Sequence, residues 1–85
     1  MMMMRFGQAL EAMQEGHRVA RAGWNGKGMW LRLIEQYQVG YDPHILGLKL
    51  LPWIGMKTAD GGFVPWLASQ TDMQADDWVE VDGKD

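Results

Sequence analysis

Two short stretches of this sequence carry the residue types that a site for a planar, polar ligand requires. The first is the loop Trp24-Asn25-Gly26-Lys27-Gly28. Its tryptophan offers a face on which a planar base can stack, and Asn25 supplies a hydrogen-bond donor and an acceptor together. Its two glycines let the backbone approach a ligand closely. The same residues also suit a simple turn whose tryptophan fills the core, and a G-x-G spacing alone does not decide between the two interpretations.

The second stretch is Ser69-Gln70-Thr71-Asp72, in which all four side chains can form hydrogen bonds. Ser69 and Thr71 are of the type that caps the first turn of a helix, and we expect them to do so here. One cap does not need four such groups. The surplus, Gln70 and Asp72, is therefore expected to face ribose hydroxyls or the edge of a base.

The sequence contains no recognisable set of catalytic or metal-binding residues. It has no Cys nucleophile, no Walker loop and no HExxH motif, and His17 and His44 are predicted to be surface residues because no acidic pattern accompanies them. Asp72, Asp76 and Asp77 do not follow the EF-hand spacing and are better explained as charges that suit a helix N-terminus. A hydrolase would need separated carboxyl pKa values at Asp72 and Asp76, which the sequence does not indicate. We expect no enzymatic activity, no metal and no cofactor.

Apolar spacing and turn signals predict the elements that position these stretches. A helix is predicted from about Phe6 to Glu15, because apolar residues recur there at helical spacing and Gly16 follows as a C-terminal cap. The turn signal Asp60-Gly61-Gly62 predicts a hairpin. The predicted strands are His17–Arg21, Met29–Glu35, Trp53–Thr58, Phe63–Trp66 and Trp78–Val81.

Thr71 and Gln74 match a capping box, which predicts one or two helical turns from Thr71 to Asp76. Tyr37–Lys49 has no clear period, and we predict a loop with at most one helical turn. The chain is therefore predicted to be one α+β domain over residues 1–85. Its N-terminal helix is expected to pack on an antiparallel sheet of about five short strands.

Composition restricts both the core and the class of partner. The chain has 85 residues and no Cys, so its five Trp and eight Met must fill much of a small core, and self-association is a further source of buried area. Residues 1–57 carry seven Lys or Arg against four Asp or Glu, whereas residues 58–85 carry one against seven. This balance argues against non-specific binding to duplex nucleic acid and lets the two halves attract each other, within or between chains. With no membrane-spanning apolar run and no secretory segment, a cytoplasmic protein is expected.

Two longer phrases of the chain resemble a known family. They are FGQALEAMQEGHRVARAGWNGKGMWL and LPWIGMKTADGGFVPWLASQTDMQADDW, which together cover most of residues 6–35 and 51–78. Both are similar to the phage Thoeris anti-defence 2 family, whose members act as sponges for immune nucleotide signals. Tyr37–Lys49 and the tail after Val81 carry no pattern that can be aligned with it.

The resemblance implies an oligomer, expected to be a homotetramer in the cytoplasm of the infected host cell. It would sequester glycocyclic ADP-ribose signals without cleaving them, in pockets between protomers, and so block Thoeris defence. Some family members also hold cyclic di- or trinucleotides at a separate site, which would extend the block to CBASS defence. The sequence leaves open whether this chain has that second site.

The resemblance also implies which residues line the pocket. They are Trp24, Asn25 and Gly26 from the first phrase, and Gln70, Thr71, Asp72 and Met73 from the second. Because the chain is acidic overall, a diphosphate needs local donors, and we expect Arg21 and Lys27 to supply them together with backbone N–H groups of the glycine loop. The alternative is a structural oligomeric interaction module without a nucleotide ligand, in which the Trp and Met residues only build a core and an interface.

Overall fold

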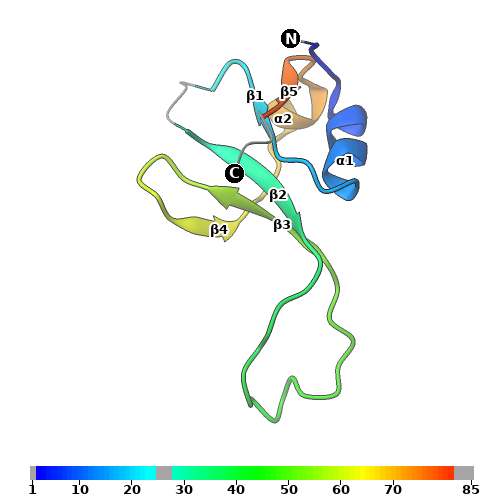
Figure 1. The fold of residues 1–85 in the computed structure, drawn as a ribbon, viewed down its shortest axis with the longest axis vertical. Helices are drawn as coiled ribbons and strands as arrows, with labels where there is room; N and C mark the ends of the chain where they lie inside the picture. The colour runs from blue at the N-terminus through cyan, green and yellow to red at the C-terminus, as the bar shows by residue number, and fades with distance from the viewer. Residues whose placement is uncertain (1, 25–27, 82–85) are drawn as a thin grey trace.

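In the computed structural model, which describes residues 2–24 and 28–81, two helices and five short strands follow one another along the chain. In order they are α1 (Phe6–Gln14), β1 (Val19–Arg21), β2 (Trp30–Ile34), β3 (Trp53–Lys57), β4 (Phe63–Pro65), α2 (Gln70–Gln74) and β5 (Trp78–Glu80). The strands form one antiparallel sheet in the order β4-β3-β2-β1-β5 (Figure 1). The predicted fold class is confirmed.

Helix α1 ends in a Schellman motif. The backbone N–H of Gly16, a residue with φ of +96°, donates to the carbonyl of Met13 at 3.0 Å. The N–H of His17 donates to the carbonyl of Ala12, also at 3.0 Å. The predicted glycine cap is therefore confirmed. Because His17 is still bonded to the helix, β1 begins at Val19, two residues later than predicted.

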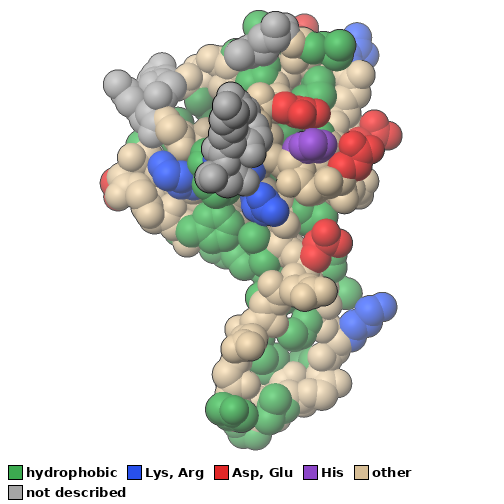
Figure 2. All heavy atoms as spheres, viewed as in Figure 1, with side chains coloured by type: hydrophobic (Ala, Val, Ile, Leu, Met, Phe, Trp, Pro, Cys, Tyr) green, Lys and Arg blue, Asp and Glu red, His purple; other side chains and the backbone are tan. Residues whose placement is uncertain are grey.

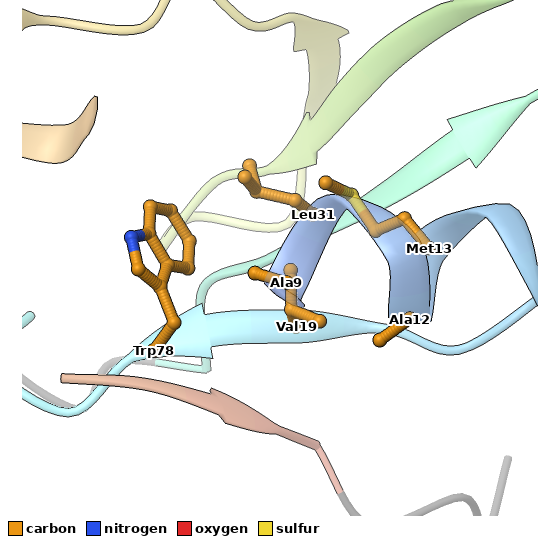
Figure 3. Close-up of a cluster of buried hydrophobic side chains, with 6 residues drawn as sticks. All are labelled: Ala9, Ala12, Met13, Val19, Leu31 and Trp78. Atoms are coloured by element: carbon orange, nitrogen blue, oxygen red, sulfur yellow. The ribbon is translucent and has the colours of Figure 1, made fainter. Parts of the chain in front are cut away.

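The core lies between α1 and the sheet (Figure 3). Its buried side chains are Ala9, Ala12, Met13, Val19, Leu31 and Trp78. Trp78 is the largest of them, and its ring contacts those of Phe6, Trp24 and Trp66 at centroid distances of 5.5 to 5.9 Å. The indole N–H of Trp78 donates to the backbone carbonyl of Asp72 at 3.0 Å. Its burial therefore leaves no polar atom of the ring without a partner.

The opposite face of the sheet carries a second aromatic cluster. Side chains alternate along β2, so Leu31 faces α1 while Trp30 faces away from it. The ring of Phe63 contacts Trp30 at 6.2 Å and Trp53 at 5.9 Å. Phe63 also lies directly over Gly55, where an added Cβ would overlap the ring. The centre of β3 therefore requires glycine.

Strands β3 and β4 form the predicted hairpin, closed by the turn at residues 60–62. The N–H of Thr58 donates to the carbonyl of Gly62 at 2.9 Å, and the N–H of Gly62 donates to the hydroxyl of Thr58 at 2.9 Å. Gly61 has φ of +92°, a conformation that favours glycine. The turn signal Asp60-Gly61-Gly62 thus has the role that the sequence predicted.

The segment between β2 and β3 extends away from the rest of the domain (Figure 1), and the molecule measures 45 by 27 by 26 Å. Tyr37–Lys49 contains only turns, as predicted, including one in which the N–H of Leu46 donates to the carbonyl of Asp42 at 3.0 Å. The hydroxyl of Tyr37 donates to the carbonyl of Leu51 at 2.5 Å and so joins the two ends of the segment. In Figure 2 the segment forms a separate lobe with hydrophobic side chains on its surface.

Gly55→Ala should lower the free energy of unfolding by about 1–3 kcal/mol, because the new methyl group would force the ring of Phe63 out of its contacts with the two tryptophans. Gly7→Ala is the matched control. Gly7 lies in α1 with no atom within 4 Å of an added Cβ, and alanine is favoured there by up to about 1 kcal/mol. Urea unfolding measures both changes. A Gly55→Ala variant as stable as wild type would contradict this packing.

Candidate functional site

Helix α2 begins at the second stretch that the sequence singled out. The hydroxyl of Ser69 accepts from the backbone N–H of Asp72 at 3.0 Å, and the carboxylate of Asp72 accepts from the N–H of Ser69 at 3.1 Å. This reciprocal pair is a capping box, and it corrects the prediction that Thr71 and Gln74 form one. Because Ser69 has the extended backbone of a cap, the helix begins at Gln70, one residue earlier than predicted.

Arg21, the last residue of β1, joins two carboxylates. Its Nη1 donates to Oδ1 of Asp72 at 3.0 Å, and its Nε donates to Oδ1 of Asp77 at 2.9 Å. The exposed fractions of the three side chains are 19, 14 and 22%, so solvent screens these pairs only in part. Asp72, which we predicted to face a ligand, has both carboxylate oxygens in bonds to Arg21 and Ser69 of its own protomer.

Asp77 belongs to the same network, although the sequence did not single it out as a site residue. Its Oδ2 accepts from the backbone N–H of Gly23 at 2.8 Å, and its carbonyl accepts from the N–H of Ala22 at 2.8 Å. The register of β1 and β5 explains this position, because Arg21 lies opposite Trp78 and residues 22 and 77 come next. From the sequence, a role for Asp77 in this network could be predicted only by predicting the register of β1 and β5.

Trp24 follows directly on this network and packs against the core. Its backbone N–H donates to the carbonyl of Arg21 at 3.1 Å. Its ring meets Trp78 edge-on, with centroids 5.5 Å apart and ring planes at 76°. The side chain is half-buried. Part of the Trp24 ring therefore fills the core, as the simpler interpretation of the loop predicts.

A pocket of about 410 Å³ opens beside Trp24. Its apolar lining comes from Ala20, Ala22, Met29, Trp30, Val79 and Val81, and Arg21, Trp24 and Gly28 complete it. This volume lies within the range of about 300–1,000 Å³ that is typical of small-molecule sites. Among the predicted residues that the structure describes, Arg21 and Trp24 line the pocket, and those of α2 do not. Asp72 reaches the same region through its bonds with Arg21 and Trp78.

The remaining predicted site residues fall into two groups. Asn25, Gly26 and Lys27 lie outside the part of the chain that the structure describes, so their roles stay predictions. Exposed on α2 are Gln70, Thr71 and Met73. These three side chains are exposed to solvent.

Hydrogen bonds keep both aspartates of the network ionised. The guanidinium of Arg21, together with the N–H of Gly23, holds the pKa of Asp77 below its usual value of 3.8 and outweighs the effect of burial. Burial works to raise the pKa of Asp72, but hydrogen bonds from Ser69 and Arg21 outweigh it, and this pKa is also lowered. The two carboxylates in turn raise the pKa of Arg21. At neutral pH the network is one cation between two anions.

Residues 2–24 and 28–81 provide neither a cluster of metal ligands nor a helix that could span a membrane. No group of three His, Asp or Glu side chains in this part of the chain is placed to hold a metal ion. Neither α1 nor α2 has the length and apolar character that crossing a membrane requires.

The fold and the site define a small α+β domain in which the β1–β2 loop and a short second helix share one buried tryptophan and one ion-pair network. Residues 4–81 match the model of the Thoeris anti-defense 2-like domain, and the chain belongs to that family. It is also 40% identical over 81 residues to Thoeris anti-defense 2 of Bacillus phage SP01, a match that covers 88% of this chain and 91% of the phage protein. The resemblance seen in the sequence is therefore confirmed.

Asp72→Asn should lower the free energy of unfolding at pH 7 by about 1–3 kcal/mol, because an amide cannot replace the charged partner of Arg21. The pKa of Asp72 is lower in the folded chain than the usual value of 3.8, so its contribution is complete above 3.8 and is lost as the pH falls through the folded value. The difference from wild type should therefore shrink as the pH falls from neutral to well below 3.8. Urea unfolding over that range measures it, and a difference that stays constant would refute the prediction.

Proposed function

We propose that this protein blocks Thoeris defence by binding glycocyclic ADP-ribose signals and holding them without cleavage. The observation that carries the proposal is membership of the Thoeris anti-defense 2-like family over residues 4–81. The 40% identity to Thoeris anti-defense 2 of Bacillus phage SP01 supports the same anti-Thoeris role. The choice of ligand rests on the family resemblance and on the chemistry of the site.

The pocket beside Trp24 suits the base of such a nucleotide. Trp24 and Trp30 are among its lining residues, and a base that stacks on an indole gains about 1–3 kcal/mol. Its remaining walls are mostly small apolar side chains, such as Ala20 and Val79, which replace water around the ring of the ligand. A site of this kind binds through stacking and exclusion of water and needs no reactive group.

The polar parts of the ligand need partners from beyond this pocket. Gln70 and Thr71 are exposed on α2 and carry the amide and hydroxyl groups that ribose hydroxyls pair with. In the proposed homotetramer, α2 of one protomer would face the pocket of another, so that the site forms between protomers. Arg21 and Lys27 are the cations that the sequence predicts for the diphosphate.

The ionisation of the aspartates supports binding without cleavage. A general acid must be protonated at its working pH, whereas the pKa values of Asp72 and Asp77 are lowered. Both carboxylates also have an arginine partner, which makes them weak bases. They suit a structural role better than acid–base catalysis.

Native mass spectrometry of the full chain should show a homotetramer of the 9.7 kDa protomer, and glycocyclic ADP-ribose should shift its mass by whole numbers of ligand. Denaturation should then release the ligand unchanged, since sequestration breaks no bond. A cleaved product would contradict the proposal. Cyclic di- and trinucleotides, added in place of glycocyclic ADP-ribose, test for a second site and a role against CBASS. A protein that binds none of these ligands would be the structural interaction module instead.

Trp24→Ala should weaken the binding of glycocyclic ADP-ribose by about 5- to 150-fold, since one stacked base is worth about 1–3 kcal/mol. Trp53→Ala is the matched control, because Trp53 lies in the second aromatic cluster, outside the pocket. Calorimetry measures the affinity, and circular dichroism with native mass measures folding and assembly. If Trp24→Ala loses folding or assembly together with its affinity, the ring has a structural role only.

A further inference from the structure

Asp77 binds the three residues that immediately precede Trp24. Its carbonyl accepts from the N–H of Ala22 at 2.8 Å, its Oδ1 accepts from Nε of Arg21 at 2.9 Å, and its Oδ2 accepts from the N–H of Gly23 at 2.8 Å. The last two are charge-assisted bonds, which are shorter and stronger than neutral ones. One residue before β5 thus fixes the end of β1 and the start of the loop that follows it.

The carboxylate of Asp77 packs closely against the backbone of Gly23. An added Cβ at Gly23 would lie 2.8 Å from Oδ2 of Asp77, closer than such atoms come in proteins. The backbone of Gly23 therefore approaches the carboxylate as closely as it does because residue 23 has no side chain. The direction in which the chain leaves β1 toward Trp24 is set by this contact.

The same network also reaches α2. Arg21 bonds to Asp77 with Nε and to Asp72 with Nη1, so the start of the loop and the first turn of α2 are joined through one side chain. Trp78 provides a second connection between α2 and the loop, because its N–H donates to the carbonyl of Asp72 while its ring contacts Trp24. Trp24 and the first turn of α2 are therefore held at a fixed spacing.

We infer that Asp77 is a positioning residue of the ligand site: through Gly23 and Arg21 it holds Trp24 and α2 in the arrangement that receives the ligand. The inference rests on the proposed function and goes beyond it, because Asp77 touches neither the pocket nor the exposed face of α2. It also gives Arg21 a different role from the predicted one. With carboxylates on two of its nitrogens, Arg21 acts by joining elements and not by binding a phosphate.

The two roles of Arg21 can be distinguished by experiment, because they predict opposite changes in ligand affinity for Asp77→Asn. If Arg21 binds the diphosphate, removing a competing carboxylate frees the guanidinium and tightens binding of an anionic ligand. If the network positions the site, the same change weakens binding, because a neutral amide replaces a charge-assisted acceptor. Asp76→Asn is the matched control, since it removes the same charge from the exposed neighbouring residue.

The test is calorimetric titration of the full chain with glycocyclic ADP-ribose, using wild type, Asp77→Asn and Asp76→Asn. We expect Asp77→Asn to lose about tenfold in affinity relative to Asp76→Asn. Amide hydrogen exchange without ligand should be about tenfold faster at Gly23 and unchanged at Met13 in α1, which separates local release of the loop from general loss of stability. Arg21→Lys should bind more weakly than wild type, because a lysine cannot bridge two carboxylates in the same geometry.

Three outcomes would overturn the inference. They are an Asp77→Asn affinity equal to or tighter than that of Asp76→Asn, equal acceleration of exchange at Gly23 and Met13, and wild-type affinity in Arg21→Lys. Failure of the proposed function looks different, because wild type itself would then not bind glycocyclic ADP-ribose in the same titration. That result would refute both the proposed ligand site and the positioning role.

Discussion

The burial of one indole, that of Trp78, is the constraint on which the rest of the domain depends. A small core without disulfides gains much from one large ring, but the ring carries an N–H that would cost about 1–3 kcal/mol if it were buried without a partner. The carbonyl of Asp72 accepts it, which fixes α2 against the sheet. Around the ring, Phe6, Trp24 and Trp66 bring α1, the β1–β2 loop and the end of the hairpin into contact.

Local signals in the sequence were enough to predict the elements of this fold. The helical spacing of Ala9 and Met13, the cap at Gly16 and the turn at residues 60–62 each depend on neighbours within a few positions, and each prediction is confirmed. The capping box was predicted two residues too late, because Ser69 with Asp72 and Thr71 with Gln74 both have the required spacing. Tertiary bonds from Arg21 and Trp78 to Asp72 favour the earlier start.

The site was predictable only in part, because its geometry depends on strand pairing. Composition allowed the basic and acidic halves of the chain to attract each other, within one chain or between chains. The structure shows one such attraction within the protomer, since Arg21 meets Asp72 and Asp77 across more than fifty residues of sequence. No local pattern specifies such a contact. Asp72 was therefore expected to be free for a ligand, and Asp77 was not expected in the site at all.

The lobe between β2 and β3 is attached to the domain at its two ends only. Pairing of Ile34 with Trp53 and the bond from Tyr37 to Leu51 close it, so residues between them can be inserted, deleted or replaced without disturbing the core. Doubling the length of a flexible loop costs only about 0.6 kcal/mol in closure entropy. A change in the length of this appendage therefore costs the folded scaffold little free energy.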